Sequence, residues 1–92
     1  MRIEVTRSGG FAGTVRRAVV DTTGLPDAEE WHRLAGTALA DGPGPSQEAS
    51  PVRDGFRYEI RADGRVVETG EHDLTPAQRE LTARALREGT RA

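Results

Sequence analysis

A glycine-rich stretch near the N-terminus, with one phenylalanine in its middle, constrains this chain more than any other feature. It reads RSGGFAG at residues 7–13 and lies between two short segments with the pattern of β-strands. Glycine adopts backbone angles that other residues avoid, and it lets the backbone approach another surface closely. The stretch is therefore expected to be a turn. Its sequence leaves two roles open for Phe11, which either folds back into the core or is presented to a partner.

The segments on either side of this stretch predict an antiparallel hairpin. Before it, Ile3 and Val5 alternate with polar residues, as in a half-buried strand. After it, residues 14–21 are rich in valine, but apolar side chains fall on both faces, so the pattern does not decide which face is buried. The connection is longer than a two-residue loop, and a β-bulge near Gly9 and Gly10 would fit this length.

A first helix is expected over residues 26–40, with a proline at its start and acidic residues in its first turn. Apolar residues from Trp31 to Leu39 recur at helical spacing and form a stripe that would pack on the sheet. We interpret Trp31 as a core anchor. Residues 41–54 follow with three prolines and few apolar side chains, and they are expected to form a flexible loop.

The second half of the chain repeats the order of hairpin and helix. Residues 56–61 alternate apolar and charged side chains, and this is the clearest strand pattern in the sequence. The Asp63-Gly64 dipeptide is typical of a two-residue type I′ turn, with a return strand over residues 65–71. Such a turn places Ile60 opposite Val67 and Tyr58 opposite Thr69.

A capping box predicts the start of a second helix. Thr75 is the expected N-cap, Pro76 follows at the first helical position, and Gln78 stands at the third. Leu81 lies in the apolar ridge of this helix. Arginine and glycine at residues 87–89 suit its C-terminus.

These elements predict an α+β fold of order ββαββα, with a four-stranded, largely antiparallel sheet and both helices on one face. The other face would carry Arg57, Glu59 and Arg61 and would be open to water or to a partner. The expected core residues are Trp31, Leu34, Leu39, Phe56, Tyr58, Ile60 and Leu81.

The length of 92 residues predicts one domain, 1–92. Its two halves, 1–40 and 55–89, would be joined by the loop at 41–54.

Composition excludes several classes of protein. No apolar run approaches the roughly 20 residues that span a bilayer, and the N-terminus lacks the layout of a signal peptide. There is no cysteine, hence no disulfide framework, and a cytoplasmic protein is expected. The net charge of −2, with both signs spread along the chain, argues against binding to nucleic acid.

No motif in the chain predicts catalysis, a cofactor or a metal. His72 lies between Glu71 and Asp73, but neighbouring side chains on an extended segment point apart, and no second cluster completes a metal site. Ser8 is not in a G-x-S-x-G elbow. The glycine stretch lacks the lysine and the spacing of a phosphate-binding loop.

The glycine stretch, with Arg16 and Arg17 after it, resembles the emfourin family. These are small bacterial protein inhibitors of thermolysin-like (M4) metallopeptidases, of the type paired with protealysin. The matching residues 3–13 read IEVTRSGGFAG, a short alternating strand that runs into R-x-G-G-F-A-G. The layout of the rest of the chain matches more loosely, and residues 41–54 and 65–71 depart from the family pattern.

The resemblance implies a non-enzymatic inhibitor whose partner is an M4-type metallopeptidase, and we expect a monomer. M4 peptidases prefer a large apolar residue just after the scissile bond, a pocket that Phe11 would suit. Peptide groups of the glycines would hydrogen-bond in the cleft as a strand does. Alternatively, Phe11 pins the turn from inside while its neighbours make the contacts. The expected partner-binding residues are Arg7, Ser8, Gly9, Gly10, Phe11, Ala12, Gly13, Arg16 and Arg17.

The stretch has no cysteine or histidine to bind the catalytic zinc. Any contact with the metal would therefore be made by a carbonyl or hydroxyl oxygen, unless the cleft is simply occluded. The alternative function is a small interaction domain without a peptidase target.

Overall fold

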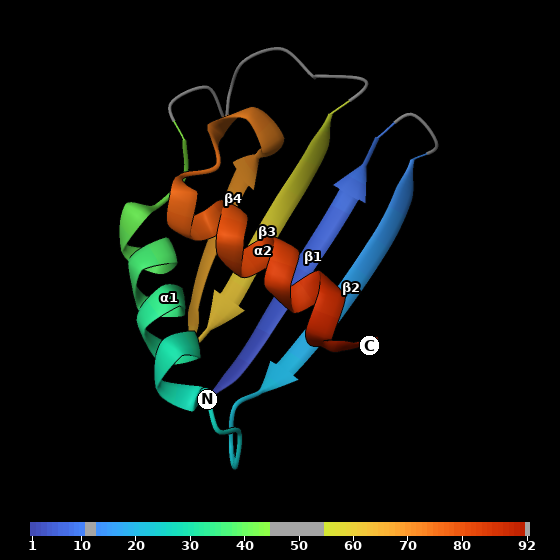
Figure 1. Cartoon of the computed structure of the whole chain (residues 1–92). Coiled ribbons are helices and arrows are strands. Elements are labelled where there is room, and N and C mark those ends of the chain that lie inside the picture. The colour runs from blue at the N-terminus through green and yellow to red at the C-terminus, as the bar shows by residue number, and fades with distance from the viewer. Residues whose placement is uncertain (11–12, 45–54, 92) are drawn as a thin grey trace.

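One antiparallel sheet carries two helices on one of its faces (Figure 1). The structure is a computed structural model that describes residues 1–10, 13–44 and 55–91. The order of the strands in the sheet is β4-β3-β1-β2-β5. In chain order the elements are β1 (Arg2–Gly9), β2 (Thr14–Asp21), α1 (Ala28–Asp41), β3 (Phe56–Ala62), β4 (Arg65–Gly70), the 3₁₀ helix η1 (Glu71–Asp73), α2 (Pro76–Glu88) and β5 (Thr90–Arg91).

The α+β class and the placement of both helices on one face are confirmed, but the sheet has five strands instead of four. The strand that the sequence analysis missed, β5, is only two residues long and pairs with Ala18 and Val19 of β2. Two residues carry no periodic pattern. Their pairing depends on where α2 brings the chain, which is a property of the tertiary structure.

Strand β1 lies between β2 and β3, so it is hydrogen-bonded on both sides. Its apolar residues Ile3 and Val5 are fully buried under the helices. In β2 the buried residues are Ala18 and Val20, which settles the face that the sequence left open. The pairing of β1 with β2 is continuous to its last pair, Gly9 with Thr14, so the ladder contains no bulge.

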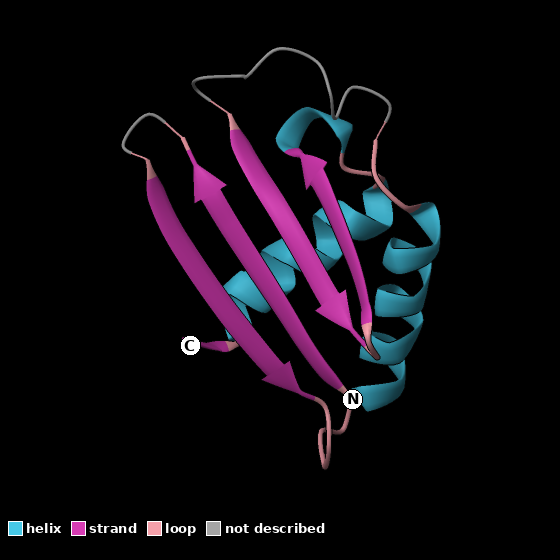
Figure 2. Ribbon diagram, turned by 180° about the vertical axis from the view of Figure 1, so that it is seen from behind, coloured by secondary structure: helices cyan, strands magenta, loops and turns pink. Residues whose placement is uncertain are grey.

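The second hairpin has the predicted turn and register. Asp63 and Gly64 both have positive φ angles, 52° and 73°, as a type I′ turn requires. Ile60 pairs with Val67, and Tyr58 lies opposite Thr69 as well. The face of the sheet that carries Arg57, Glu59 and Arg61 is covered by neither helix (Figure 2).

Helix α1 begins two residues later than the proline suggested, and α2 begins as expected. Trp31 and Leu39 of α1 are buried in the core. The capping box of α2 is formed by Thr75 and Gln78. The fully buried amide of Gln78 also donates to the carbonyl oxygens of Ala38, at 3.0 Å, and Gly42, at 2.7 Å. One side chain thus joins the start of α2 to the end of α1.

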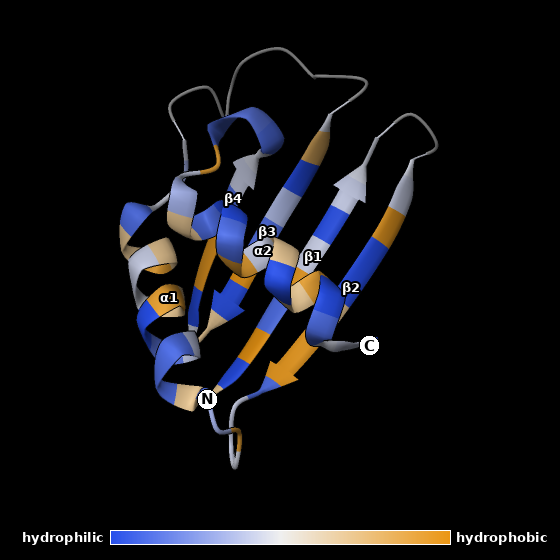
Figure 3. Cartoon of the chain, viewed as in Figure 1, coloured by the Kyte–Doolittle hydropathy of each residue, from blue (hydrophilic) through white to orange (hydrophobic). Residues whose placement is uncertain are grey.

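The core lies beneath the two helices, away from the end of the sheet where β1 meets the glycine stretch (Figure 3). Ile60 and Leu81 are fully buried as expected. Leu34 and Tyr58 are only partly buried at the core's edge, and Phe56 lies outside the core. Phe56 alternates correctly with its neighbours, but it is the first residue of β3, at the end of the strand away from the core.

The expected loop at 41–54 is only partly covered by the structure. Asp41 is the last residue of α1, residues 42–44 follow it, and residues 45–54 lie outside the described residues. Of the two described α-helices, neither is long and apolar enough to cross a membrane.

Candidate functional site

The end of the β1–β2 hairpin projects beyond α2, away from the core (Figures 1 and 2). We call residues 9–13 the glycine turn. Its glycines Gly9, Gly10 and Gly13 have φ angles of 97°, 75° and 64°, in the left-handed region that favours glycine. The amide of Gly13 donates to the carbonyl oxygen of Gly10 at 3.1 Å. These three positions therefore favour glycine over other residues.

The glycine turn is also fastened to the start of β3. The amide of Gly10 donates to the carbonyl oxygen of Gly55 at 3.0 Å. A Cβ atom placed on Gly10 would lie 2.6 Å from Cε1 of the Phe56 ring, and one on Gly9 would lie 3.1 Å from the Gly55 oxygen. Glycine is thus required here for close contact as well as for backbone angle.

Phe56, which the sequence analysis placed in the core, instead contacts the glycine turn. Its own amide donates to Oε1 of Glu71 at 2.9 Å. The guanidinium carbon of Arg7 lies 4.5 Å from the centroid of its ring, in a cation–π contact. The ring is therefore in contact with both the glycine turn and the last part of β1.

The arginines that the sequence analysis grouped together separate onto two faces. Arg7 and Arg16 are directly paired across β1 and β2 and lie on the face that the helices cover. The guanidinium of Arg16 donates to the carbonyl oxygen of Leu86 in α2. Arg17, one residue further along β2 and opposite Thr6, points to the other face.

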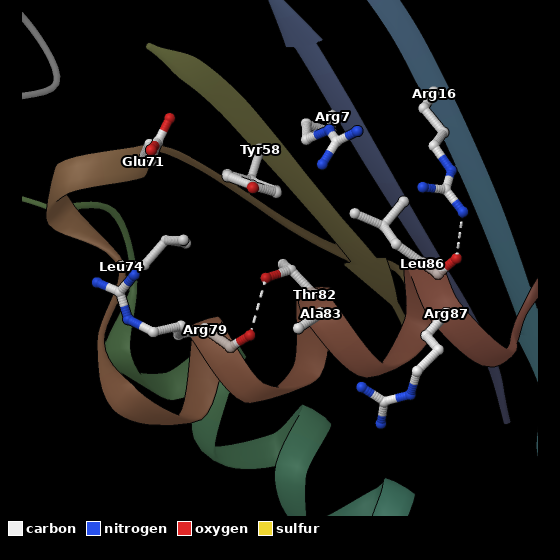
Figure 4. A pocket seen from close by; sticks show the side chains of 10 residues that line it. All are labelled: Arg7, Arg16, Tyr58, Glu71, Leu74, Arg79, Thr82, Ala83, Leu86 and Arg87. Atoms are coloured by element: carbon white, nitrogen blue, oxygen red, sulfur yellow. Dashed lines mark hydrogen bonds between the residues drawn. The ribbon is translucent and has the colours of Figure 1, made fainter.

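An open groove lies beside the turn, between this end of the sheet and α2, with a volume of about 570 Å³ (Figure 4). Arg7, Arg16 and Tyr58 line it from the sheet, and Arg79, Leu86 and Arg87 line it from α2. We call it the arginine groove. The sequence analysis missed the contribution of α2, although residues 79, 83 and 87 are spaced four apart and so share one face of that helix.

The arginine groove is strongly basic and contains one carboxylate, that of Glu71. Within the described residues, ion pairs of the groove arginines are limited to Arg87, whose guanidinium lies 3.4 Å from the carboxylate of Glu88. Arg7, Arg16 and Arg79 form none there.

Arg84, on another face of α2, forms several ion pairs. Its guanidinium contacts the carboxylates of Asp27, Glu30 and Glu88 and lies over the Trp31 ring. Burial lowers the pKa of Arg84, but the hydrogen bond to Glu30 and the three negative charges outweigh it and raise that pKa. Arg84 thus holds α2 against α1, a role that the described contacts of Arg7 and Arg79 do not have.

Neither histidine belongs to a metal-binding group within residues 1–10, 13–44 and 55–91, where no cluster of three or more possible ligands occurs. Nε2 of His32 lies 2.8 Å from the hydroxyl of Thr22, a contact that helps to hold the chain after β2. His72 is exposed in η1. Ser8 lies inside the β1 ladder, opposite Val15.

The structure thus brings together Arg7, Arg16 and the described glycines, and it separates Arg17 from them. Phe11 and Ala12, also expected to bind a partner, lie outside the described residues. Ser8 and Gly9 are paired with both neighbouring strands.

Comparison with known proteins gives one match. The model of the family named Emfourin matches residues 5–86, a span that begins in β1 and ends in α2. No curated protein and no solved structure matches the chain. The matched span includes the glycine turn, the second hairpin, all of α1 and nearly all of α2. Because the match covers most of its length, the chain belongs to the emfourin family.

Proposed function

We propose that this chain inhibits thermolysin-like (M4) metallopeptidases and that its glycine turn enters their active-site cleft. Membership of the emfourin family supports a protease as the partner. Within the proposal, Phe11 occupies the apolar pocket just after the scissile bond. The chain acts as a binding protein and takes no part in chemistry.

The observation that carries this proposal is the attachment of the turn to β3. Gly10 is hydrogen-bonded to Gly55 and lies against the Phe56 ring, so the backbone on one side of Phe11 is held before any partner arrives. A segment that is already ordered loses less conformational entropy on binding, and this favours affinity. A turn that served only to reverse the chain would have no need of these contacts.

The pairing of the strands limits which backbone groups are available to contact the peptidase. The peptide groups of Ser8 and Gly9 belong to a strand with partners on both sides, and the Gly10 amide is already bonded to Gly55. We therefore assign the contact with the cleft to the part of the turn that follows Gly10. The earlier residues hold the turn in place.

The proposal is tested by measuring the inhibition constant against thermolysin or a protealysin-like enzyme for the wild type and for Phe11→Ala. Loss of an aromatic anchor costs about 2 kcal/mol or more at a binding hot spot, so we expect inhibition to weaken by about 30-fold or more. Val66→Ala is the matched control, because Val66 is an exposed apolar residue on β4, the strand at the far edge of the sheet.

Circular dichroism checks that both variants fold. Unchanged inhibition by folded Phe11→Ala would remove Phe11 from the mechanism. A wild-type protein that leaves M4 peptidases fully active would overturn the inhibitor function and leave an interaction domain with another target.

A further inference from the structure

The arginine groove is positively charged, although the chain as a whole has a negative net charge. The sequence contains 13 arginines and 15 acidic residues and has a net charge of −2. The groove nevertheless gathers four arginines around the single carboxylate of Glu71. That carboxylate already accepts a hydrogen bond from the amide of Phe56. Glu71, and Glu88 through its ion pair with Arg87, offset part of this charge, whereas Arg7, Arg16 and Arg79 form no ion pair with the described residues.

The guanidinium donors in the groove are largely unused. A guanidinium carries five N–H donors. Among the described residues, Arg16 donates a side-chain hydrogen bond to the Leu86 carbonyl oxygen, and Arg7 lies over the Phe56 ring without a side-chain hydrogen bond. The Arg79 guanidinium has no hydrogen bond or ion pair with the described residues. Contacts with Leu86 and Phe56 position Arg16 and Arg7, and all three guanidinium groups can bind carboxylates in bidentate fashion.

The shape and the floor of the groove suit a peptide segment. Between the arginines lie the Tyr58 ring and the side chains of Leu74, Ala83 and Leu86 (Figure 4). Its volume of about 570 Å³ falls within the range of roughly 300–1,000 Å³ that is usual for binding pockets. An apolar floor with cationic sides favours a segment that combines carboxylates with apolar side chains.

We propose that the arginine groove binds an acidic segment of the same peptidase whose cleft receives the glycine turn. The two sites are continuous, because Arg7 and Arg16 lie on the strands that lead into and out of the turn. This proposal rests on the proposed function, since it assigns the acidic segment to the inhibited enzyme. The groove adds electrostatic steering and orients the inhibitor on the rim of the cleft.

A first experiment tests the groove without a peptidase. The protein is titrated with an end-blocked peptide of alternating glutamate and leucine and, in parallel, with its glutamine counterpart, while amide chemical shifts are followed by NMR. We expect the shifts to centre on Tyr58, Thr82 and Leu86, with the glutamate peptide bound at least about fivefold more tightly at low salt. Equal binding of the two peptides, or shifts on the opposite face of the sheet, would overturn the proposal.

Single-stranded DNA is titrated in the same way, because arginines also bind phosphates. An oligonucleotide that occupies the groove more tightly than the acidic peptide would overturn the assignment to a protein partner.

A second experiment connects the groove to inhibition through the association rate constant with the peptidase. Arg79→Gln/Arg87→Gln removes two exposed groove arginines. Arg57→Gln/Arg61→Gln removes the same charge from two exposed residues on the uncovered face of the sheet. We expect the groove variant to associate about tenfold more slowly at low salt and to depend less on salt, with the control close to the wild type.

The outcomes separate this proposal from the proposed function. Inhibition by the wild type, together with equal rates for the groove variant and its control, would overturn the role of the groove and leave the function standing. A wild type that inhibits no M4 peptidase overturns the function and, with it, the assignment of the segment to that enzyme. The peptide titration then still decides whether the groove binds carboxylates.

Discussion

The two hairpins of the sheet use glycine in different ways. In the β3–β4 hairpin, Gly64 has a φ of 73°, and a Cβ atom placed on it would meet nothing within 4 Å. In the β1–β2 hairpin, Gly10 has a φ of 75°, and a Cβ atom there would collide with the Phe56 ring. The two φ angles are almost equal, so the difference lies in what surrounds the two glycines.

This difference separates a turn that reverses the chain from a turn that is held by another part of the molecule. The Asp63-Gly64 turn follows from its own dipeptide. The glycine turn needs Gly55 and Phe56, which are more than forty residues away in the sequence. A contact of this kind restricts which residues can occupy both segments. We attribute this restriction to the binding role proposed for the turn.

The largest effect is expected for Gly10→Ala, which tests the contact directly. The left-handed backbone and the clash with Phe56 together should lower the free energy of unfolding by about 2–4 kcal/mol. Chemical denaturation measures this. Gly13→Ala is the control, because Gly13 has a φ of 64° and open space around it, so a loss of only about 1–2 kcal/mol is expected there. Equal losses at the two positions would show that the contact with Phe56 adds nothing.

The second prediction concerns the other partner in the same contact, the Phe56 ring. Phe56→Ala should lower the free energy of unfolding by about 1–3 kcal/mol, because the ring is half-buried. It should also accelerate hydrogen exchange at the Gly10 amide more than at Ile60 in the middle of β3, since the turn loses its support. Unaltered protection of the Gly10 amide would contradict the view that the ring holds the turn.

The third prediction concerns the hairpin whose turn has no such contact. Gly64→Ala should cost about 1–2 kcal/mol, the penalty of the left-handed backbone alone. It should leave the inhibition constant unchanged. Thermal unfolding and the peptidase assay measure the two quantities, and weaker inhibition by a folded Gly64→Ala would show that the second hairpin also takes part in binding.

The smallest effect is expected at the opposite end of the first hairpin. Oδ1 of Asp21 accepts a hydrogen bond from the Thr23 amide at 3.0 Å, and this bond lowers the pKa of Asp21. A carboxylate whose pKa is lower in the folded state adds stability above its unfolded pKa and loses it as the pH falls through the folded pKa.

Asp21→Asn should therefore be slightly less stable than the wild type near neutral pH, and the difference should shrink in acid. Thermal unfolding of both proteins from about pH 6 to about pH 2 covers the range in which Asp titrates. A difference that stays constant over this range would show that the charge of Asp21 is not its cause.

Local patterns predicted most of the fold correctly. The register of β3 with β4 follows from a dipeptide with one preferred turn, and the start of α2 follows from a capping box. Residues far apart in the chain were harder to place. The alternation in β3 put Phe56 on the correct face of the sheet but could not show that it lies outside the core. Arg16 and Arg17 are neighbours in a predicted strand, so their placement on opposite faces follows from the strand pattern, but only the packing of α2 decided which of them lies under the helices.

The candidate site likewise has one part that the sequence predicts and one part that it does not. Its glycine turn is visible in the sequence, because left-handed backbone angles demand particular residues locally, and the family resemblance there is confirmed. The arginine groove is lined by residues of β1, β2 and α2, and no local sequence pattern predicts that these elements lie together. By itself, the sequence determined the two α-helices, the four longer strands, the Asp63-Gly64 turn and the family, since these depend on neighbouring residues. Only the tertiary structure decided what holds the turn and where the free charge gathers, because both depend on contacts between distant segments.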